Sequence, residues 1–412
     1  MEKVIAAALG GVTIFAACSF AQEASTQPGA EKPETWMDRD SLFIASASED
    51  ITKKTGFAPS LNWTGEVWSN LSDGRDIRTI ADSLFTLGFE QDLSVLAGKE
   101  GWGRIGLSAF YYTQTNGGEL GGFNSSQGCF SNIVAGDMAR GFEIYYANDF
   151  ETKFGNIGFR IGQLADEDFM GMDYSDVFLN SSFGAMPNVA PGQLFSQYNV
   201  ATLGAVIYYS QGNFDATFGV YNGNIGQDIS SNNGFDYSNT FDTVALWYQF
   251  GYNYEIGGLA GRAMFGGNYH SDPSKINFDA IDAGSFYSFY VGLQQALIND
   301  DEGNAKFGVY TRIGWVPSSK ASDNNFYADF GFNWFAPIPC RENDIFAVGF
   351  SVIENERAAR AEYSHYEGAL EITYRFQITP AIALQPDFQI FVNQGEDSET
   401  AYIAGARLEV NF

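Results

Sequence analysis

The last residues of the chain alternate between apolar and polar up to a terminal aromatic side chain. One face of this segment carries Tyr402, Ala404, Ala406, Leu408, Val410 and Phe412, and the other carries Ile403, Gly405, Arg407, Glu409 and Asn411. A period of two predicts a β-strand between apolar and polar surroundings. A soluble β-sandwich alternates in the same way. A C-terminal aromatic residue after such a strand is, however, what the barrel-assembly machinery of bacterial outer membranes recognises, so Phe412 is expected to contact that machinery.

Fifteen further segments have strand character. The sixteen predicted strands lie near 57–69, 84–94, 102–114, 140–150, 154–164, 200–210, 213–222, 242–254, 259–270, 284–294, 305–315, 325–335, 344–353, 369–379, 381–392 and 401–412. Short connections at 151–153, 211–212, 255–258 and 380 alternate with long ones at 115–139, 165–199, 223–241 and 354–368. Short periplasmic turns and long outer loops give this alternation. We therefore predict an all-β fold, a porin-like transmembrane antiparallel β-barrel of sixteen strands.

The polar faces of the predicted strands carry charges, as at Glu371, Arg375 and Asp387. An unpaired charge in a sealed core is very costly, whereas a water-filled lumen accepts it. No apolar run after the N-terminus reaches the roughly 20 residues that a spanning helix needs. The net charge of -28 argues against nucleic acid as a partner. Acidic outer loops favour solvation or divalent-ion bridging to lipopolysaccharide.

The N-terminus has the pattern of an export signal. Lys3 precedes an apolar run, and Ser19-Phe20-Ala21 offers the small residues that a signal peptidase reads, which predicts cleavage after residue 21. The alternative is a lipoprotein signal ending at Cys18, with Phe15 in place of the usual Leu. Residues 22–56 are predicted to be a periplasmic leader, and 57–412 the barrel in the outer membrane.

The connection 165–199 is the longest, and loops of this length are usually functional or disordered. It combines acidic residues with apolar ones that can pack, which favours an inward-folded constriction loop. Side chains alternate in direction along a strand, and this alternation turns five arginines toward the loop. The predicted pore-lining charges are therefore Asp166, Glu167, Asp168 and Asp176 on the loop, Arg160, Arg262, Arg312, Arg375 and Arg407 on the wall, and Glu371 and Asp387 beside them. The alternative is that the arginines pair with wall carboxylates for structural reasons.

Parity also turns aromatic residues inward, among them Tyr290, Tyr310 and Tyr327. Aromatic faces stack on the C–H faces of sugars, while arginine and carboxylate side chains bond to hydroxyl groups. Inward aromatic residues can also serve packing alone. Only a contiguous inward track would indicate a path for sugars.

Residues for other chemistry are scarce. His270 and His365 are the only candidate general bases, both in or beside predicted outer loops, so we predict that the protein is not an enzyme. No metal site and no cofactor are expected. Cys129 is predicted outside and Cys340 in the periplasm, which excludes a disulfide bond between them.

Three stretches carry a resemblance to a known family. "VFLNSSFGAMPNVAP" from Val177, "GAVIYYSQGNFDATFGVYNGN" from Gly204 and "EITYRFQITPAIALQPDFQIFVNQG" from Glu371 resemble the carbohydrate-selective porin (OprB) family, and weaker similarity extends over roughly residues 57–412. The resemblance implies a sixteen-stranded porin that passes small sugars by diffusion through an eyelet lined by arginines. The alternative is a general or anion-preferring diffusion porin. The sequence leaves a homotrimer and a monomer both open.

Overall fold

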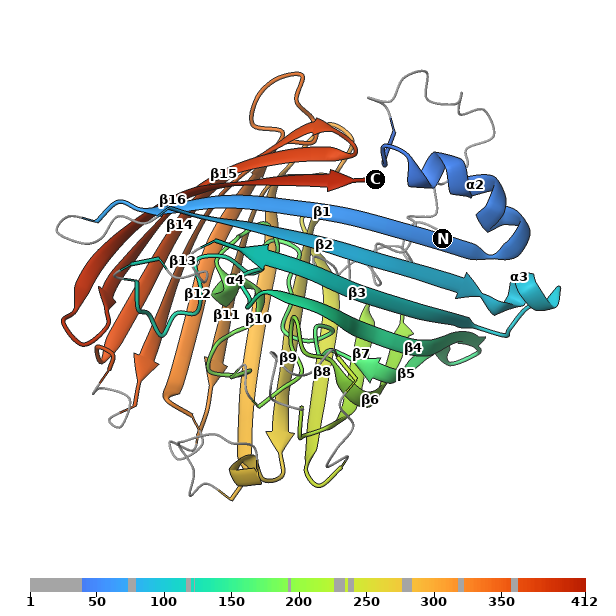
Figure 1. Ribbon diagram of the computed structural model, residues 1–412, viewed down its shortest axis with the longest axis horizontal. Helices are drawn as coiled ribbons and strands as arrows, with labels where there is room; N and C mark the ends of the chain where they lie inside the picture. Colours follow the sequence, from blue (N-terminus) through green and yellow to red (C-terminus); the bar gives the residue numbers. More distant parts are fainter. Residues whose placement is uncertain are drawn as a thin grey trace.

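The fold is a closed antiparallel β-barrel (Figure 1). The computed structural model describes residues 39–72, 79–115, 120–121, 123–191, 194–225, 234–235, 241–275, 284–317, 322–356 and 362–412. The strands are β1 (Phe57–Asn70), β2 (Thr79–Asp92), β3 (Arg104–Gln114), β4 (Met138–Thr152), β5 (Gly155–Leu164), β6 (Thr202–Gln211), β7 (Phe214–Asn222), β8 (Val244–Ile256), β9 (Leu259–His270), β10 (Phe286–Asn299), β11 (Ala305–Trp315), β12 (Asn324–Phe335), β13 (Ile345–Asn355), β14 (Tyr366–Thr379), β15 (Ile382–Gln394) and β16 (Glu399–Asn411). The prediction of a sixteen-stranded barrel is confirmed.

Each strand pairs with its neighbours in sequence, and β1 closes the ring against β16, from Asn62 opposite Asn411 to Asn70 opposite Ile403. Closure leaves no free sheet edge, which is the condition for a sheet to cross a bilayer. The outward face is apolar and exposed, as at Val67, Leu87 and Tyr402. The alternation seen in the sequence therefore separates an apolar outer face from a polar inner one.

Two strands depart most from their predicted bounds. β2 begins at Thr79, five residues before the predicted start, because Asp82 and Ser83 weaken the apolar pattern there. β10 continues to Asn299, beyond the predicted end at residue 294, because its register shifts between Ala296 and Ile298 and again between Ile298 and Asn299. A bulge breaks the period of two, so the pattern cannot be followed through it.

The predicted leader is not simply an extended segment, because it contains the helix α2 (Ile44–Thr55). Gly56 ends the helix with a positive φ of 73°, and its backbone N–H bonds to the carbonyl of Thr52. Glycine takes this left-handed conformation without steric cost. The predicted signal, Cys18 and the leader up to residue 38 lie outside the described residues.

The connections define two ends of the barrel. Short turns and the helix α3 (Leu93–Ala97) form one end, called here the short-turn end. The segments 115–137 and 165–201, the latter containing α4 (Ser181–Gly184), and the helix η3 (Pro273–Lys275) belong to the opposite, long-loop end. Cys129 and Cys340 lie at opposite ends and are unpaired, as predicted. Within the described ranges, no helix has the length and apolar character needed to cross a membrane.

Candidate functional site

The long segment 165–199 is bonded to inward side chains all around the barrel. Met170 N–H donates to Gln249 on β8 at 3.0 Å, and Gln385 on β15 donates to the carbonyl of Val177 at 2.7 Å. β8 and β15 lie seven strands apart in a ring of sixteen, so a segment that reaches both must cross the inside of the barrel. Figure 1 shows this segment in green between β1–β3 in front and the strands behind.

Arg312 on β11 is the wall residue that makes the most hydrogen bonds to this segment among the described residues. Its side chain is 0% exposed and forms an ion pair with Asp329 on β12 at 2.5 Å. The same guanidinium donates to the carbonyls of Met170, Phe183 and Gly184 at 3.1, 2.6 and 2.8 Å. A guanidinium has five donors in a fixed plane and can hold a carboxylate and several carbonyls together. Arg312 therefore ties the loop to the wall.

A carboxylate ties down the other side of α4. Glu371 on β14 is fully buried and accepts from the backbone N–H groups of Leu179 and Asn180 at 2.6 and 2.9 Å. Asp387 on the adjacent strand accepts from Gln389 at 2.8 Å. Charge-assisted hydrogen bonds are stronger than neutral ones. The Arg312 guanidinium and the Glu371 carboxyl group thus bind the carbonyl and amide groups of one loop.

The beginning of the loop is rich in carboxylates around Arg160 on β5. Arg160 forms an ion pair with Asp168, and its Nη1 lies 3.9 Å from Glu143. Asp166 is buried, whereas Glu167 is half-buried. Burial and the neighbouring carboxylate of Glu143 raise the pKa of Glu167 to about 8. One arginine thus stands among four acids.

Asp176 lies farther along the loop. Burial and the nearby Asp173 raise the pKa of Asp176 to about 7. A raised pKa means that the packed loop favours the neutral acid. The packing of this loop is therefore coupled to pH near neutrality.

A second segment, 115–137, is held to the wall beside the first. Arg407 on β16 pairs with Glu66 on β1 at 2.5 Å and also donates to Asn132 at 2.5 Å. Ser126 N–H donates to Glu367 on β14 at 2.8 Å. Two segments, not one, therefore occupy the long-loop half of the interior.

The predicted aromatic residues lie under this packing. Tyr290, Tyr310 and Tyr327 are at most 1% exposed. Phe178 of the loop packs on Tyr310, and the Tyr327 hydroxyl donates to the carbonyl of Ser182 at 2.9 Å. Their ring faces are covered, so in this structure they pack against the loop and are not free for stacking on a solute.

The short-turn half of the interior is different. Three ion pairs, the vestibule pairs, keep both side chains partly exposed: Arg104 with Glu90 at 3.3 Å, Arg262 with Asp215 at 2.6 Å, and Arg375 with Glu409. The exposed fractions run from 16% to 29%. These groups lie near the strand ends beside the short turns. Their partial exposure leaves these charges within reach of a solute in the lumen.

Sequence reasoning turned Arg262 and Arg375 toward the lumen but did not identify Arg104 or Arg140. Arg104 lies eight residues before Tyr112 on β3, and this even separation places both on the inward face, so the strand period could have identified it. Arg140 on β4 also points inward and is 4% exposed, with Nε and Nη1 unpaired. Arg140 is the first residue of the predicted strand 140–150, and the inward or outward direction of a side chain is least certain at a strand end. Register shifts between β3 and β4 added to this difficulty.

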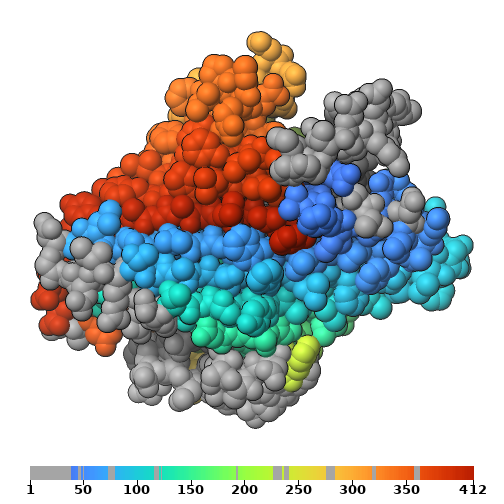
Figure 2. Space-filling view, turned by 45° about the horizontal axis from the view of Figure 1, so that its top comes forward, coloured from blue at the N-terminus to red at the C-terminus, as the bar shows by residue number. Residues whose placement is uncertain are grey.

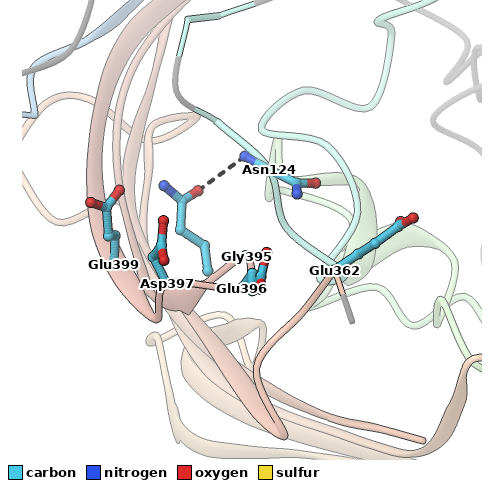
Figure 3. Close-up of a pocket in the computed structure, with 7 residues that line it drawn as sticks. Asn124, Glu362, Gly395, Glu396, Asp397 and Glu399 are labelled. Carbon is cyan, nitrogen blue, oxygen red and sulfur yellow. Dashed lines mark hydrogen bonds between the residues drawn. The ribbon is translucent and has the colours of Figure 1, made fainter. Parts of the chain in front are cut away.

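A pocket of about 320 Å³ opens at the long-loop rim and is separate from the vestibule pairs (Figure 3). Its lining comes from the β15–β16 turn, from Glu362 and from Asn124, whose N–H donates to Gln394 at 3.3 Å. Four of the seven lining residues are acidic. Among the described residues, no group of three or more His, Cys, Asp or Glu has the arrangement of a metal site.

The two histidines are not arranged as catalytic bases. His365 lies 3.1 Å from Glu354, while the neighbouring Ser364 hydroxyl donates to the carbonyl of Gly395 at 2.9 Å. His270 is buried, and its Nε2 lies 2.9 Å from the carbonyl of Gly223. Among the described residues, no serine or cysteine is bonded to either imidazole, as a nucleophilic triad requires.

Comparison with known proteins gives one family match. The model described as "Carbohydrate-selective porin, OprB family" matches residues 81–412. "Putative porin QuiX" of Acinetobacter baylyi is 25% identical over 182 residues, 38% of this chain and 41% of that protein. The chain thus aligns with less than half the length of this curated relative.

Solved structures share the fold. The high-pH structure of Pseudomonas putida OprB matches with a TM-score of 0.78 and 17% identity, covering 92% of this chain and 100% of that chain. The low-pH structure of the same protein matches with a TM-score of 0.60 and 13% identity, covering 91% and 99%. At such identities, the match concerns the fold alone.

Proposed function

Because the chain belongs to the carbohydrate-selective porin (OprB) family, we propose that it lets small sugars diffuse passively through the barrel, with the loop 165–199 as the constriction. A porin of this family spans the outer membrane, so the short-turn end is the periplasmic end and the long-loop end faces outward. Porins are channels and not enzymes. Passage needs no cofactor and no energy coupling in this proposal.

The observation that carries the proposal is the fixed position of the loop. Arg312 and Glu371 bind its backbone from β11 and β14, and Arg160 binds Asp168. A loop held by these three side chains cannot swing freely out of the lumen. It therefore narrows the path at a constant place, as selection between solutes requires.

The pairing of the arginines favours a neutral polar solute over an anion. Each of the five predicted lumen arginines has a carboxylate partner: Asp168, Asp215, Asp329, Glu409 and Glu66 bind Arg160, Arg262, Arg312, Arg375 and Arg407 in that order. Paired charges offer donors and acceptors to hydroxyl groups without a net positive field. A bare cationic ring, which an anion-preferring porin would need, does not describe these five residues.

The test is single-channel conductance of the refolded protein in a planar bilayer, titrated with glucose and then with a maltose-sized sugar. Saturable block of the ion current by sugar supports the proposal. An open current that sugar does not block favours a general porin instead. A Glu362→Gln variant, changed in the outer-rim pocket, serves as a matched control and should be blocked like the parent chain.

The proposal includes export of the chain across the inner membrane by a cleaved signal peptide. The pattern at Ser19-Phe20-Ala21 supports cleavage by signal peptidase after residue 21. The N-terminal sequence of the protein recovered from outer membranes would begin at Gln22. A lipid-modified N-terminus at Cys18 would instead establish the lipoprotein alternative.

A further inference from the structure

Large apolar side chains gather at the periplasmic rim beside β1–β3. Phe43 at the start of α2, Ile51 within α2, Val95 and Leu96 on α3, and Trp102 before β3 are 40–67% exposed. We call these five residues the rim patch. α2 contacts both α3 and β1. Figure 2 shows α2, in dark blue, beside the end of β16, in dark red.

The rim patch lies on the outer side of the wall, not over the lumen. Gln91 donates to the carbonyl of Thr55 at 2.7 Å, which joins the end of α2 to β2. Gln91 belongs to the same face of β2 as Leu87, which is 53% exposed on the apolar outer surface. The last turn of α2 is therefore fastened to the lipid-facing side of the strand.

A second contact gives the same placement for the loop before β3. The hydroxyl of Tyr146 donates to the carbonyl of Trp102 at 3.1 Å. Tyr146 lies opposite Ile105 on β3 and Ile161 on β5, both exposed on the outer surface. The rim patch is thus continuous with the apolar belt that contacts lipid.

The polar residues beside the patch suit a lipid headgroup layer. Lys53 and Lys54 lie in the last turn of α2, and Lys99 follows α3, all exposed. Helices that lie in a membrane interface have an apolar face in the acyl boundary and basic residues toward the headgroups. Lysine chains can extend from an apolar face to reach the phosphates.

We propose that α2 and α3 lie in the headgroup layer of the periplasmic leaflet and anchor this side of the barrel to phospholipid. The rim patch is then covered by lipid, and an apolar surface that would otherwise face water is buried. The two helices extend the lipid-contacting surface past the ends of β1–β3. The barrel is held at a defined depth on this side.

The experiment uses the full chain with Cys18, Cys129 and Cys340 changed to serine, refolded into vesicles of phosphatidylethanolamine and phosphatidylglycerol. An environment-sensitive fluorophore is attached at Leu96→Cys. The matched control is Glu100→Cys, four positions along the chain and also exposed. Both sites are on the surface, and heat-modifiable electrophoretic mobility checks that each variant folds.

The expected result is loss of iodide quenching for the Leu96→Cys label, together with quenching by lipids brominated near the headgroup. The Glu100→Cys label should keep its iodide quenching. Equal iodide quenching at the two sites would overturn the proposal. Energy transfer between labels on different chains, with no effect of brominated lipid, would assign the patch to a second copy and would also overturn it.

Discussion

The two halves of the barrel interior hold their charges in opposite ways. In the outer half, Arg312 and Glu371 are buried, and both bind backbone groups of the loop 165–199. In the periplasmic half, the vestibule pairs join one wall strand to another and stay partly exposed to the lumen. Similar side chains thus fix a loop in one half and line an aqueous path in the other.

The difference follows from solvation. A buried ion pair loses its hydration, so removal of one partner leaves the other charge uncompensated at high cost. A partly exposed pair keeps much of its hydration, and its net contribution to stability is small. Outer-half substitutions should therefore change folding and loop position, and vestibule substitutions should change permeation.

The largest expected effect is that of Arg312→Met. The substitution leaves Asp329 without its cation and the loop carbonyls without their donor, so we expect destabilisation by about 3–5 kcal/mol. The measurement is the urea midpoint of the refolded protein, with proteinase K cleavage within 165–199 as a report on the loop. Arg375→Met is the matched vestibule control. Equal midpoints for the two variants would refute the contrast between the halves.

The second prediction concerns the opposite anchor. Glu371→Gln keeps the shape of the side chain but replaces one of the two oxygens that accept from Leu179 and Asn180 with an NH2 donor, and we expect a loss of about 1–3 kcal/mol in local stability. Hydrogen exchange of these two amides should accelerate while the strand amides stay protected. Glu409→Gln in the vestibule should leave the exchange of both amides unchanged. Unchanged exchange in Glu371→Gln would mean that the loop does not depend on this carboxylate.

The sequence predicted the wall far better than the interior. Alternation is a local property, so strands such as β9 and β11 were predicted with the bounds that the structure has. The pattern weakened where polar residues gathered, as at Asp82, and failed at the register shift after Ala296. α2 was missed because Ile44 and Ile51 are its only large apolar residues, although Lys53, Lys54 and Gly56 are typical of a helix end.

Partners inside the barrel could not be read from the sequence. Parity turned Arg312 inward but could not indicate whether its carboxylate would come from the loop or from Asp329 on the wall. Burial of Tyr310 and Tyr327 depends on how the loop 165–199 crosses the lumen, which no local pattern encodes. A strand period fixes the direction of a side chain, whereas its solvent exposure depends on residues far away in the sequence.

The third prediction uses pH to loosen the outer half. The pKa of Glu167 is raised to about 8 and that of Asp176 to about 7, in each case first by burial. At a pH between the ordinary carboxyl pKa and these raised values, Glu167 and Asp176 are protonated in the packed loop and ionised in the released loop. Loop stability should therefore fall as pH rises through this window. Proteinase K cleavage within 165–199 should increase from pH 5 to pH 9.

Substitutions of these two acids test the cause of that pH dependence. Glu167→Gln combined with Asp176→Asn should flatten the profile, because neither side chain can then ionise. Glu362→Gln is the control, since Glu362 lines the outer-rim pocket outside this loop and should leave the profile in place. A double variant with the pH profile of the parent chain would assign the dependence to other groups.

The smallest effect on stability, and the clearest on permeation, is expected in the vestibule. Arg375→Gln removes the nearer of two arginines from Glu409, which still lies 3.9 Å from Arg407, and the loss at this partly exposed site costs less than about 1 kcal/mol, while Glu409→Gln leaves Arg375 in place. The first variant should raise the cation-to-anion permeability ratio and the second should lower it, because each changes the local field by one charge of opposite sign. Reversal potentials across a salt gradient measure both ratios. Because exposed charges are screened, the two shifts should shrink together as the salt concentration rises. Shifts of the same sign would mean that the pair does not border the path of the ions, and the assignment of the vestibule to the conducting lumen would then be wrong.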